Sequence, residues 1–137
     1  MRLPLILLAP LLLAGCFIKT SSYPIDNDGH VITVRVEKPY FWSKEGVLSV
    51  IMARMPDCQR QVELGSVWLD GMQVELIGNG NNVYTLRADD EAWKIETTSC
   101  STLEAPQADA VTGLPLGIFN FDADDKLVFE KPEAAEQ

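Results

Sequence analysis

The side chains that could carry out catalysis are few in this chain of 137 residues. His30 is the single histidine, so a catalytic Ser-His-Asp or Cys-His arrangement would depend on it alone. It follows a polar, turn-rich stretch, which predicts an exposed position that is poorly suited to a water-excluding site. Acidic residues are numerous enough to supply the paired carboxylates of a glycosidase, but no spacing singles out a pair. We therefore expect this protein not to be an enzyme.

Two acidic segments are candidates for calcium binding. Asp26, Asp28, His30 and Glu37 fall at positions 1, 3, 5 and 12 of an EF-hand-like loop. The sixth position is a valine where the loop needs glycine, and histidine is a poor ligand for a hard cation. A second group of acids, at 122–125, is typical of an ordinary turn. We therefore expect neither a metal ion nor another cofactor.

The amino-terminal segment is organised like a cleaved leader. Arg2 precedes an apolar run over residues 3–13, which is too short for a hydrocarbon core that needs about 20 residues. Two prolines within the run also disfavour a spanning helix. The tetrapeptide Leu13-Ala14-Gly15-Cys16 resembles the lipobox of bacterial lipoproteins. The resemblance implies that a signal peptide, residues 1–15, is removed and that Cys16 is acylated and becomes the membrane anchor.

The same resemblance implies a location. Phe17, and not aspartate, follows the lipid-bearing cysteine, which in the enteric sorting pattern favours the outer membrane, facing the periplasm. The alternatives to a lipoprotein leader are an ordinary signal peptide with an incidental cysteine and a buried core segment. Beyond Cys16, the chain is similar to small Gram-negative envelope lipoproteins in size, expected disulfide and β content.

Assigning Cys16 to lipid leaves two cysteines, Cys58 and Cys100. An even number of cysteines in an oxidising compartment indicates a disulfide, whereas a metal site would need more ligands than these and one histidine provide. Bridged cysteines are not available as nucleophiles. The bridge would close a loop of about 42 residues and stabilise the fold by about 4 kcal/mol in the chain-entropy model.

The charge of the chain limits its partners. Removing residues 1–15 takes away Arg2 and no acid, so the formal net charge changes from −9 to −10. Residues 101–137 hold eight acidic and two basic side chains. Such a surface repels nucleic acid and anionic head groups. It suits a cationic partner, or simple solubility beside a membrane.

Three consecutive aromatic residues, Tyr40, Phe41 and Trp42, form a candidate partner surface. In an extended chain they cannot all face one core, so we expect at least one to reach the surface and to contact a partner or a carbohydrate. The alternative is that two rings are buried and the tyrosine hydroxyl lies in water. Trp68 and Trp93 lie in alternating stretches and are expected in the core.

The pattern of the remaining chain predicts one all-β domain. Residues 30–37 alternate apolar and polar side chains with β-branched residues, which is typical of a half-buried strand. The expected strands cover 30–37, 47–55, 59–69, 72–77, 83–88, 92–98, 116–121 and 126–129. We expect a tether at 16–29, a single β domain at 30–130 and a flexible tail at 131–137.

The expected disulfide constrains the number of strands. Bridged Cα atoms lie about 4.4–6.8 Å apart, so an even number of antiparallel strands should separate Cys58 from Cys100. The segment 59–69 is therefore expected to be one strand with a bulge at Gly65, and Asp70-Gly71 to form a tight hairpin. Curling of the sheet would then bring the two cysteines together. The fold expected from about eight short strands is a small antiparallel sandwich or barrel.

These observations together predict a lipid-anchored, non-enzymatic envelope protein whose β domain binds or braces another envelope component or the cell wall. One alternative is similarity to the membrane-bound lysozyme inhibitors, acidic β-barrel lipoproteins with a disulfide. Their inhibitory Ser-Gly-x-x-Tyr pattern is absent between Cys58 and Cys100. A second alternative is a carrier that holds an apolar ligand in a cavity of several hundred Å³.

Overall fold

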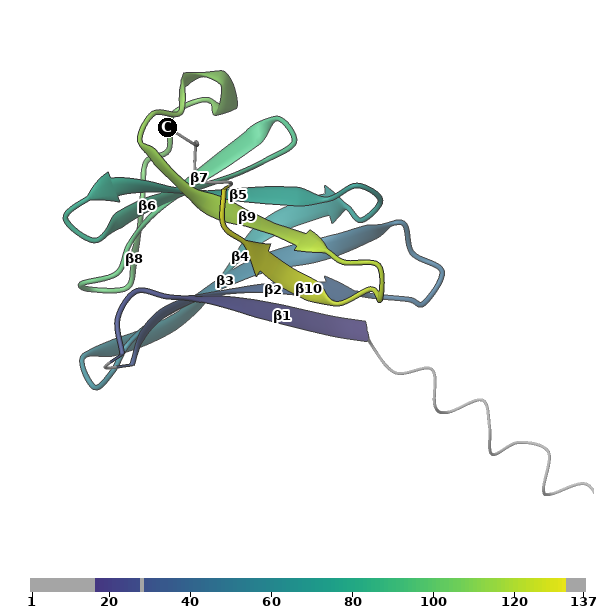
Figure 1. The fold of residues 1–137 in the computed structure, drawn as a ribbon, viewed down its shortest axis with the longest axis horizontal. Coiled ribbons are helices and arrows are strands. Elements are labelled where there is room, and N and C mark those ends of the chain that lie inside the picture. Colours follow the sequence, from purple (N-terminus) through teal and green to yellow (C-terminus); the bar gives the residue numbers. More distant parts are fainter. Residues whose placement is uncertain (1–16, 28, 133–137) are drawn as a thin grey trace, which may run out of the picture.

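Two antiparallel β-sheets pack face to face as a sandwich in the structure, a computed structural model that describes residues 17–27 and 29–132 (Figure 1). One sheet has four strands in the order β1-β2-β3-β4, and the other has six in the order β10-β9-β5-β6-β7-β8. The expected all-β antiparallel fold is confirmed, with ten described strands where about eight were expected. The lipobox and Cys16 lie outside the described residues.

The strands follow the chain in simple order within the first sheet. Its members are β1 (Phe17–Pro24), β2 (His30–Lys38), β3 (Glu45–Arg54) and β4 (Cys58–Trp68). The second sheet contains β5 (Gln73–Gly80), β6 (Val83–Ala88), β7 (Glu91–Glu96), β8 (Ser101–Leu103), β9 (Leu114–Phe121) and β10 (Leu127–Glu130). A short 3₁₀ turn, η2 (Ala108–Ala110), lies between β8 and β9. No helix in the described part of the chain is long and apolar enough to cross a membrane.

The core lies between the two sheets. Alternation on β2 and β3 directs apolar side chains inward in matched pairs, as in Ile32 opposite Met52 and Val34 opposite Val50. The second sheet meets them with its own inward residues, of which Phe119 is the largest fully buried side chain. Burial of about 25 cal/mol per Å² of apolar surface makes this layer the main source of stability.

The segment expected to be a tether is strand β1 for most of its length. Phe17 pairs with Lys38 at one end of the β1–β2 ladder, and Pro24 pairs with Val31 at the other. β1 lies at the edge of the sheet, and its side chains are half-buried at most. It therefore needs few apolar residues, and its polar sequence did not predict a strand. It is held by the backbone ladder and by Tyr23, whose ring lies 5.1 Å from that of Phe129 on β10.

The four strands expected between the cysteines are confirmed, as is the bulge. Opposite Leu48 and Ser49 the register of β4 jumps from Gly65 to Glu63, so Leu64 is the extra residue. A single strand therefore runs through the whole segment, as the disulfide geometry required.

The expected hairpin at Asp70-Gly71 is wrong. β4 pairs with β3, whereas β5 pairs with β6 and β9, so this turn carries the chain from one sheet to the other. The cysteines are therefore brought together by the stacking of two sheets and not by the curling of one. Local turn chemistry could not distinguish these outcomes, because an Asp-Gly turn reverses the chain in either case.

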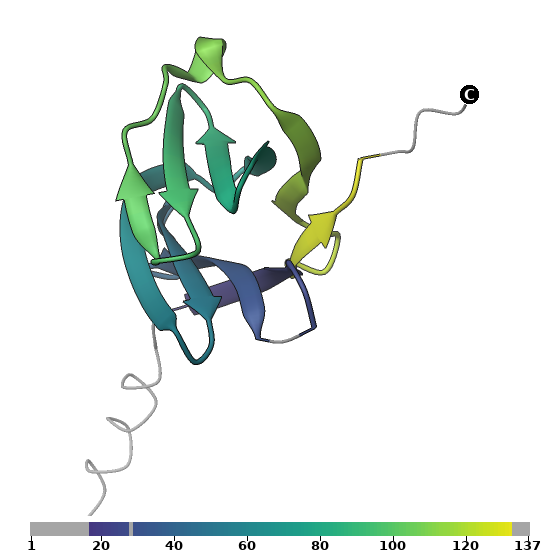
Figure 2. The ribbon, with the colours of Figure 1, turned by 90° about the vertical axis from the view of Figure 1, so that its left-hand side faces the viewer.

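The turns gather at two ends of the sandwich. The end that we call the aromatic end contains Phe17, the β2–β3 loop (39–44), the β4–β5 turn (69–72) and the β9–β10 turn (122–126). It lies at the right of Figure 1, where the ribbon begins. The opposite end, which we call the disulfide end, contains the cysteine bridge and His30, and it faces the viewer in Figure 2.

Candidate functional site

The three aromatic residues singled out by the sequence form an exposed cluster in the β2–β3 loop. Tyr40, Phe41 and Trp42 are 59%, 71% and 64% exposed. The rings of Tyr40 and Trp42 are stacked, with centroids 5.0 Å apart and an interplanar angle of 10°. Phe41 meets Trp42 edge-on, at 4.7 Å and 88°. The expectation that at least one ring reaches the surface is confirmed, and the alternative with two buried rings is wrong.

The loop that carries these rings is fastened at its base. Pro39 has no amide N–H to continue the ladder and follows the last residue of β2. The amide of Ser43 donates to the carbonyl of Tyr40 at 3.0 Å, and the Ser43 hydroxyl donates to the carbonyl of Glu45 at 2.8 Å. The amide of Leu69 also donates to the carbonyl of Lys44 at 3.0 Å. The rings therefore project from a base that is held by its own turn and by the residue that follows β4.

Phe17, the first described residue, lies beside this loop. Its register partner is Lys38, two residues before Tyr40. The Lys19 ammonium lies 4.1 Å from the centroid of the Phe17 ring, and that of Lys38 lies 5.8 Å away, both within cation–π range. Sequence reasoning missed this position because it treated the segment as a tether. The alternation that places Phe17 and Tyr23 on one side of the strand was the available signal.

A groove of about 420 Å³ continues from Phe17 across the aromatic end. Lys19 and Lys38 line one part of it, and Asp122 and Asp125 line another. Charges of both signs therefore meet in this groove.

The acidic β9–β10 turn is held together by its own backbone. The Asp122 carboxylate accepts hydrogen bonds from the amides of Asp124 and Lys126, each at 2.9 Å. Within residues 17–27 and 29–132, no group of three or more His, Cys, Asp or Glu side chains is arranged to hold a metal ion. The arrangement of Asp122 is that of a turn-capping side chain.

Trp68 was expected in the core, and this is wrong: its side chain is 55% exposed. Before the bulge, Val62 and Leu64 point toward the core, whereas after it Val67 is buried. One extra residue reverses the alternation, which turns Trp68 outward. Trp93 is partly buried and packs against the core.

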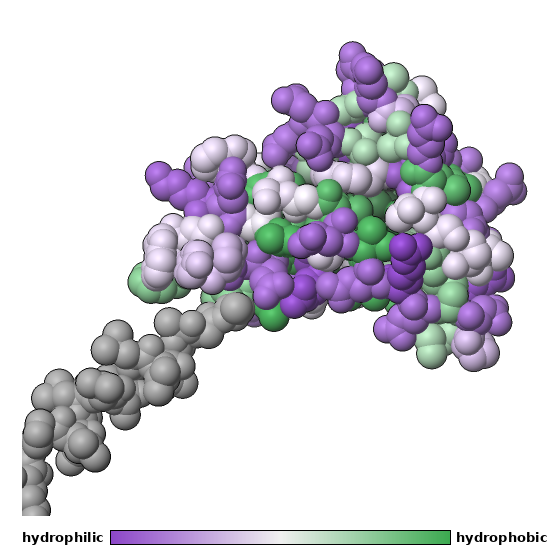
Figure 3. Space-filling model, turned by 180° about the vertical axis from the view of Figure 1, so that it is seen from behind, coloured by the Kyte–Doolittle hydropathy of each residue, from purple (hydrophilic) through white to green (hydrophobic). Residues whose placement is uncertain are grey.

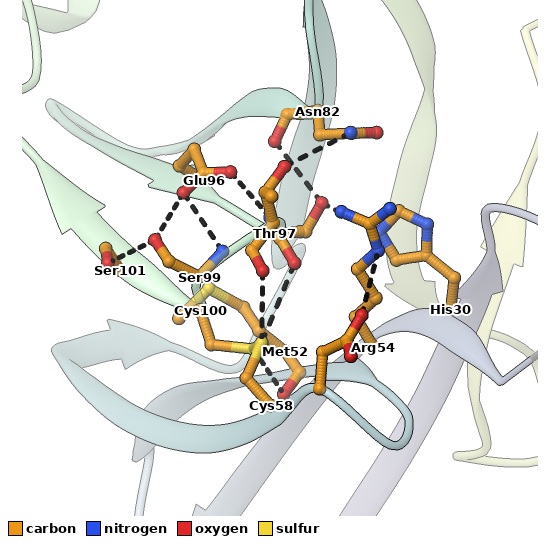
Figure 4. The surroundings of a disulfide bond; sticks show 12 residues. His30, Met52, Arg54, Cys58, Asn82, Glu96, Thr97, Ser99, Cys100 and Ser101 are labelled. Atoms are coloured by element: carbon orange, nitrogen blue, oxygen red, sulfur yellow. Dashed lines mark hydrogen bonds and ion pairs between the residues drawn. A yellow bond between two sulfur atoms is a disulfide. The ribbon is translucent and has the colours of Figure 1, made fainter.

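The disulfide between Cys58 and Cys100 confirms the expected pairing, with Cα atoms 6.0 Å apart (Figure 4). Cys58 begins β4 in the first sheet, and Cys100 follows β7 in the second. The bond therefore crosslinks the two layers. The turn before Cys100 is fixed by Glu96, whose carboxylate accepts hydrogen bonds from the Ser99 hydroxyl at 2.6 Å and the Thr98 amide at 2.5 Å. These bonds, first from Ser99 and then from Thr98, lower the pKa of Glu96 to about 2.

His30 was expected to be exposed, and this is also wrong, since only 5% of it is accessible. His30 is the first residue on the inward face of β2, which it shares with Ile32 and Val34, so its ring points toward the second sheet. Its Nε2 atom lies 2.8 Å from the hydroxyl of Thr97, and its Nδ1 lies 3.4 Å from the carboxylate of Asp26. A carboxylate, an imidazole and a hydroxyl thus follow one another, as in a hydrolase relay.

The burial of this trio is opposite to that of a catalytic relay. Thr97 is 0% exposed, so no substrate can reach its hydroxyl, whereas the Asp26 side chain is 51% exposed. In a hydrolase the nucleophile is accessible and the carboxylate is buried. The contacts of Thr97, which also lies 3.3 Å from the carbonyl of Asn82, are those of a buried polar link between the sheets (Figure 4).

No family model, curated protein or solved structure matches this chain.

Proposed function

We propose that this protein is a lipid-anchored, non-enzymatic lipoprotein of the bacterial cell envelope, and that its β-sandwich binds or braces another envelope component. The lipobox-like Leu13-Ala14-Gly15-Cys16 supplies the anchor. The observation that carries the proposal is that β1 begins at Phe17, the residue directly after Cys16. If Cys16 is acylated, no spacer separates the lipid-bearing residue from the first strand of the domain. A domain held in this way suits recognition or bracing close to the membrane.

The distribution of reactive groups supports binding over catalysis. His30 and Thr97 are used as buried hydrogen-bonding partners, and Cys58 and Cys100 are joined to each other. The aromatic rings of the β2–β3 loop are among the most exposed large hydrophobic side chains of the described residues. Rings of this kind contribute contact area, which is what a binding surface needs.

The anchor is tested by mass spectrometry of the protein purified from membranes. We expect a mature chain that begins at Cys16 and carries acyl chains, and a Cys16→Ser variant that leaves the membrane fraction. A native chain without acyl groups would contradict the proposal.

The binding role is tested by chemical crosslinking in intact envelopes. A single stoichiometric adduct is expected, and its absence counts against the role.

Acidic residues support a cationic partner. Asp90, Glu91 and Asp109 line a groove of about 600 Å³ on the second sheet. The same acidity favours a second candidate, inhibition of a cationic lysozyme, although the inhibitory Ser-Gly-x-x-Tyr pattern of that family is missing. Adding the purified protein to a cell-wall lysis assay tests it, and an unchanged lysis rate would dismiss it. Side chains fill the space between the sheets in the described residues, which does not favour a ligand carrier.

A further inference from the structure

We infer that the aromatic end docks on the bilayer surface itself, with Tyr40, Phe41 and Trp42 inserted at the level of the lipid head groups. This inference rests on the proposed acylation of Cys16. It assigns the exposed rings to the membrane, and so leaves the rest of the sandwich to meet a protein or cell-wall partner.

The position of Phe17 carries the first step. Phe17 is fixed in register with Lys38, and Tyr40 of the β2–β3 loop is the next residue but one. One residue of chain spans at most about 3.6 Å, so an acylated Cys16 cannot lie far from this end. Figure 1 shows that the ribbon begins at the same end of the sandwich as the β2–β3 loop. Anchor and rings therefore meet the bilayer together.

The chemistry of the side chains carries the second step. Tryptophan and tyrosine favour the membrane–water interface because they combine an apolar ring with a polar atom. Phe41, the most exposed of the three, has no polar atom and gains most from leaving water. Lys38 and Lys44 flank the loop, and their long stems let the ammonium groups reach lipid phosphates while the rings insert. Figure 3, which views the molecule from behind, shows hydrophilic and hydrophobic side chains interspersed at both ends of the sandwich.

The arrangement of the rings favours a bilayer over a carbohydrate. A sugar-binding platform presents open ring faces to the solvent. Here Tyr40 and Trp42 cover one face of each other, and Phe41 packs edge-on against Trp42. The three rings form a compact wedge, which suits insertion among lipid head groups. A short anchor beside the wedge would also hold it against the membrane and away from a soluble glycan.

Charge decides which bilayer this end suits. The groove beside Phe17 contains Lys19 and Lys38 as well as Asp122 and Asp125, and the whole chain is strongly acidic. The mixed charge of this groove gives no preference for anionic lipids, and the negative net charge of the protein opposes binding to them. We therefore assign the aromatic end to a zwitterionic surface, where apolar insertion drives contact.

Fluorescence quenching in vesicles tests the inference. The full acylated protein is reconstituted into phosphatidylcholine vesicles that contain lipid brominated near the head-group end of the acyl chain. Quenching of tryptophan emission is expected. It should fall at least twofold in Trp42→Phe. Trp68→Phe removes a similarly exposed tryptophan that ends β4 at the same end of the sandwich but outside the loop, and it measures how much of the quenching does not come from Trp42. Circular dichroism checks that both variants keep the sheet content.

The outcomes separate the two proposals. If the protein floats with the vesicles but Trp42 emission is quenched by aqueous iodide and not by brominated lipid, the docking inference is overturned. The proposed lipid anchor would then be unaffected. If the protein carries no acyl chains and does not float, the proposed anchoring fails and the docking falls with it. Equal quenching in the Trp42→Phe variant would also overturn insertion of the loop.

Discussion

The two ends of the sandwich use their side chains in opposite ways. At the disulfide end, polar groups are buried and joined: Cys58 is bonded to Cys100, and His30 contacts Thr97. At the aromatic end, large apolar rings are exposed, although a buried position would stabilise the fold. Surface rings of this size contribute little to folding, and we propose that they are exposed for contact with another component. One end thus stabilises the domain, while the other exposes the surface that we propose for interaction.

The largest expected effect on stability comes from breaking the disulfide. Replacing Cys58 and Cys100 together by serine should lower the free energy of unfolding by about 4 kcal/mol, because the open chain regains loop entropy. Urea unfolding followed by circular dichroism measures this, and the reduced native chain provides the control. An unchanged unfolding midpoint would show that the disulfide end does not stabilise the fold more than the aromatic end.

The buried pair at the same end should have a smaller effect. His30→Ala and Thr97→Val each leave one buried polar group without its partner, at an expected cost of about 1–3 kcal/mol. Because the two side chains contact each other, the double variant should cost less than the sum of the single variants. Urea unfolding of all three variants tests this. Strict additivity would mean that the hydrogen bond contributes nothing.

Acid should weaken the disulfide end selectively. The pKa of Glu96 is about 2 in the folded chain and ordinary, near 4.5, when unfolded. Its stabilising effect is therefore complete above about pH 5 and is lost as the pH falls through 4.5 toward 2. Glu96→Gln should lower the melting temperature at neutral pH and flatten the acid dependence of thermal unfolding between about pH 4.5 and pH 2, with no new pH dependence between pH 7 and pH 5. An identical acid profile in the variant would contradict this cause.

The smallest effect on folding is expected at the aromatic end. Trp42→Ala and Phe41→Ala should change the free energy of unfolding by no more than about 0.5 kcal/mol, since exposed side chains rarely matter more. Urea unfolding beside the wild-type chain provides the measurement. A loss of several kcal/mol in either variant would mean that the loop packs as part of the fold, and would remove the contrast between the ends.

Much of the fold was predictable from short-range pattern. Alternation of β-branched residues located β2, and two cysteines with a required strand count gave the single bulged strand β4. The outward orientation of Trp68 was not predicted. One inserted residue reverses the orientation of every later side chain in the strand, and the alternation pattern was read without this reversal. The change of sheet at Asp70-Gly71 depends on which strands compete for the neighbouring edges, which no local sequence encodes.

The candidate site was only partly predictable. The succession of Tyr40, Phe41 and Trp42 was enough to expect exposure, because adjacent residues in an extended chain face opposite ways. The proximity of Phe17 depended on β1 joining the sheet, and its polar composition is weak evidence for a strand. The burial of His30 could have been predicted, because the alternation of β2 places it on the same face as Ile32 and Val34.

The place of β9 in the second sheet also has a consequence for the order of folding. β9 pairs with β5 on one side and with β10 on the other, although residues 81–113 separate β5 from β9 in the chain. Until residues 114–121 have been synthesised, β5 keeps an unpaired edge of the kind that promotes aggregation. We therefore expect a chain that stops before Leu114 to be prone to aggregation and to proteolysis. The second sheet can therefore be completed only after residues 114–121 have been synthesised.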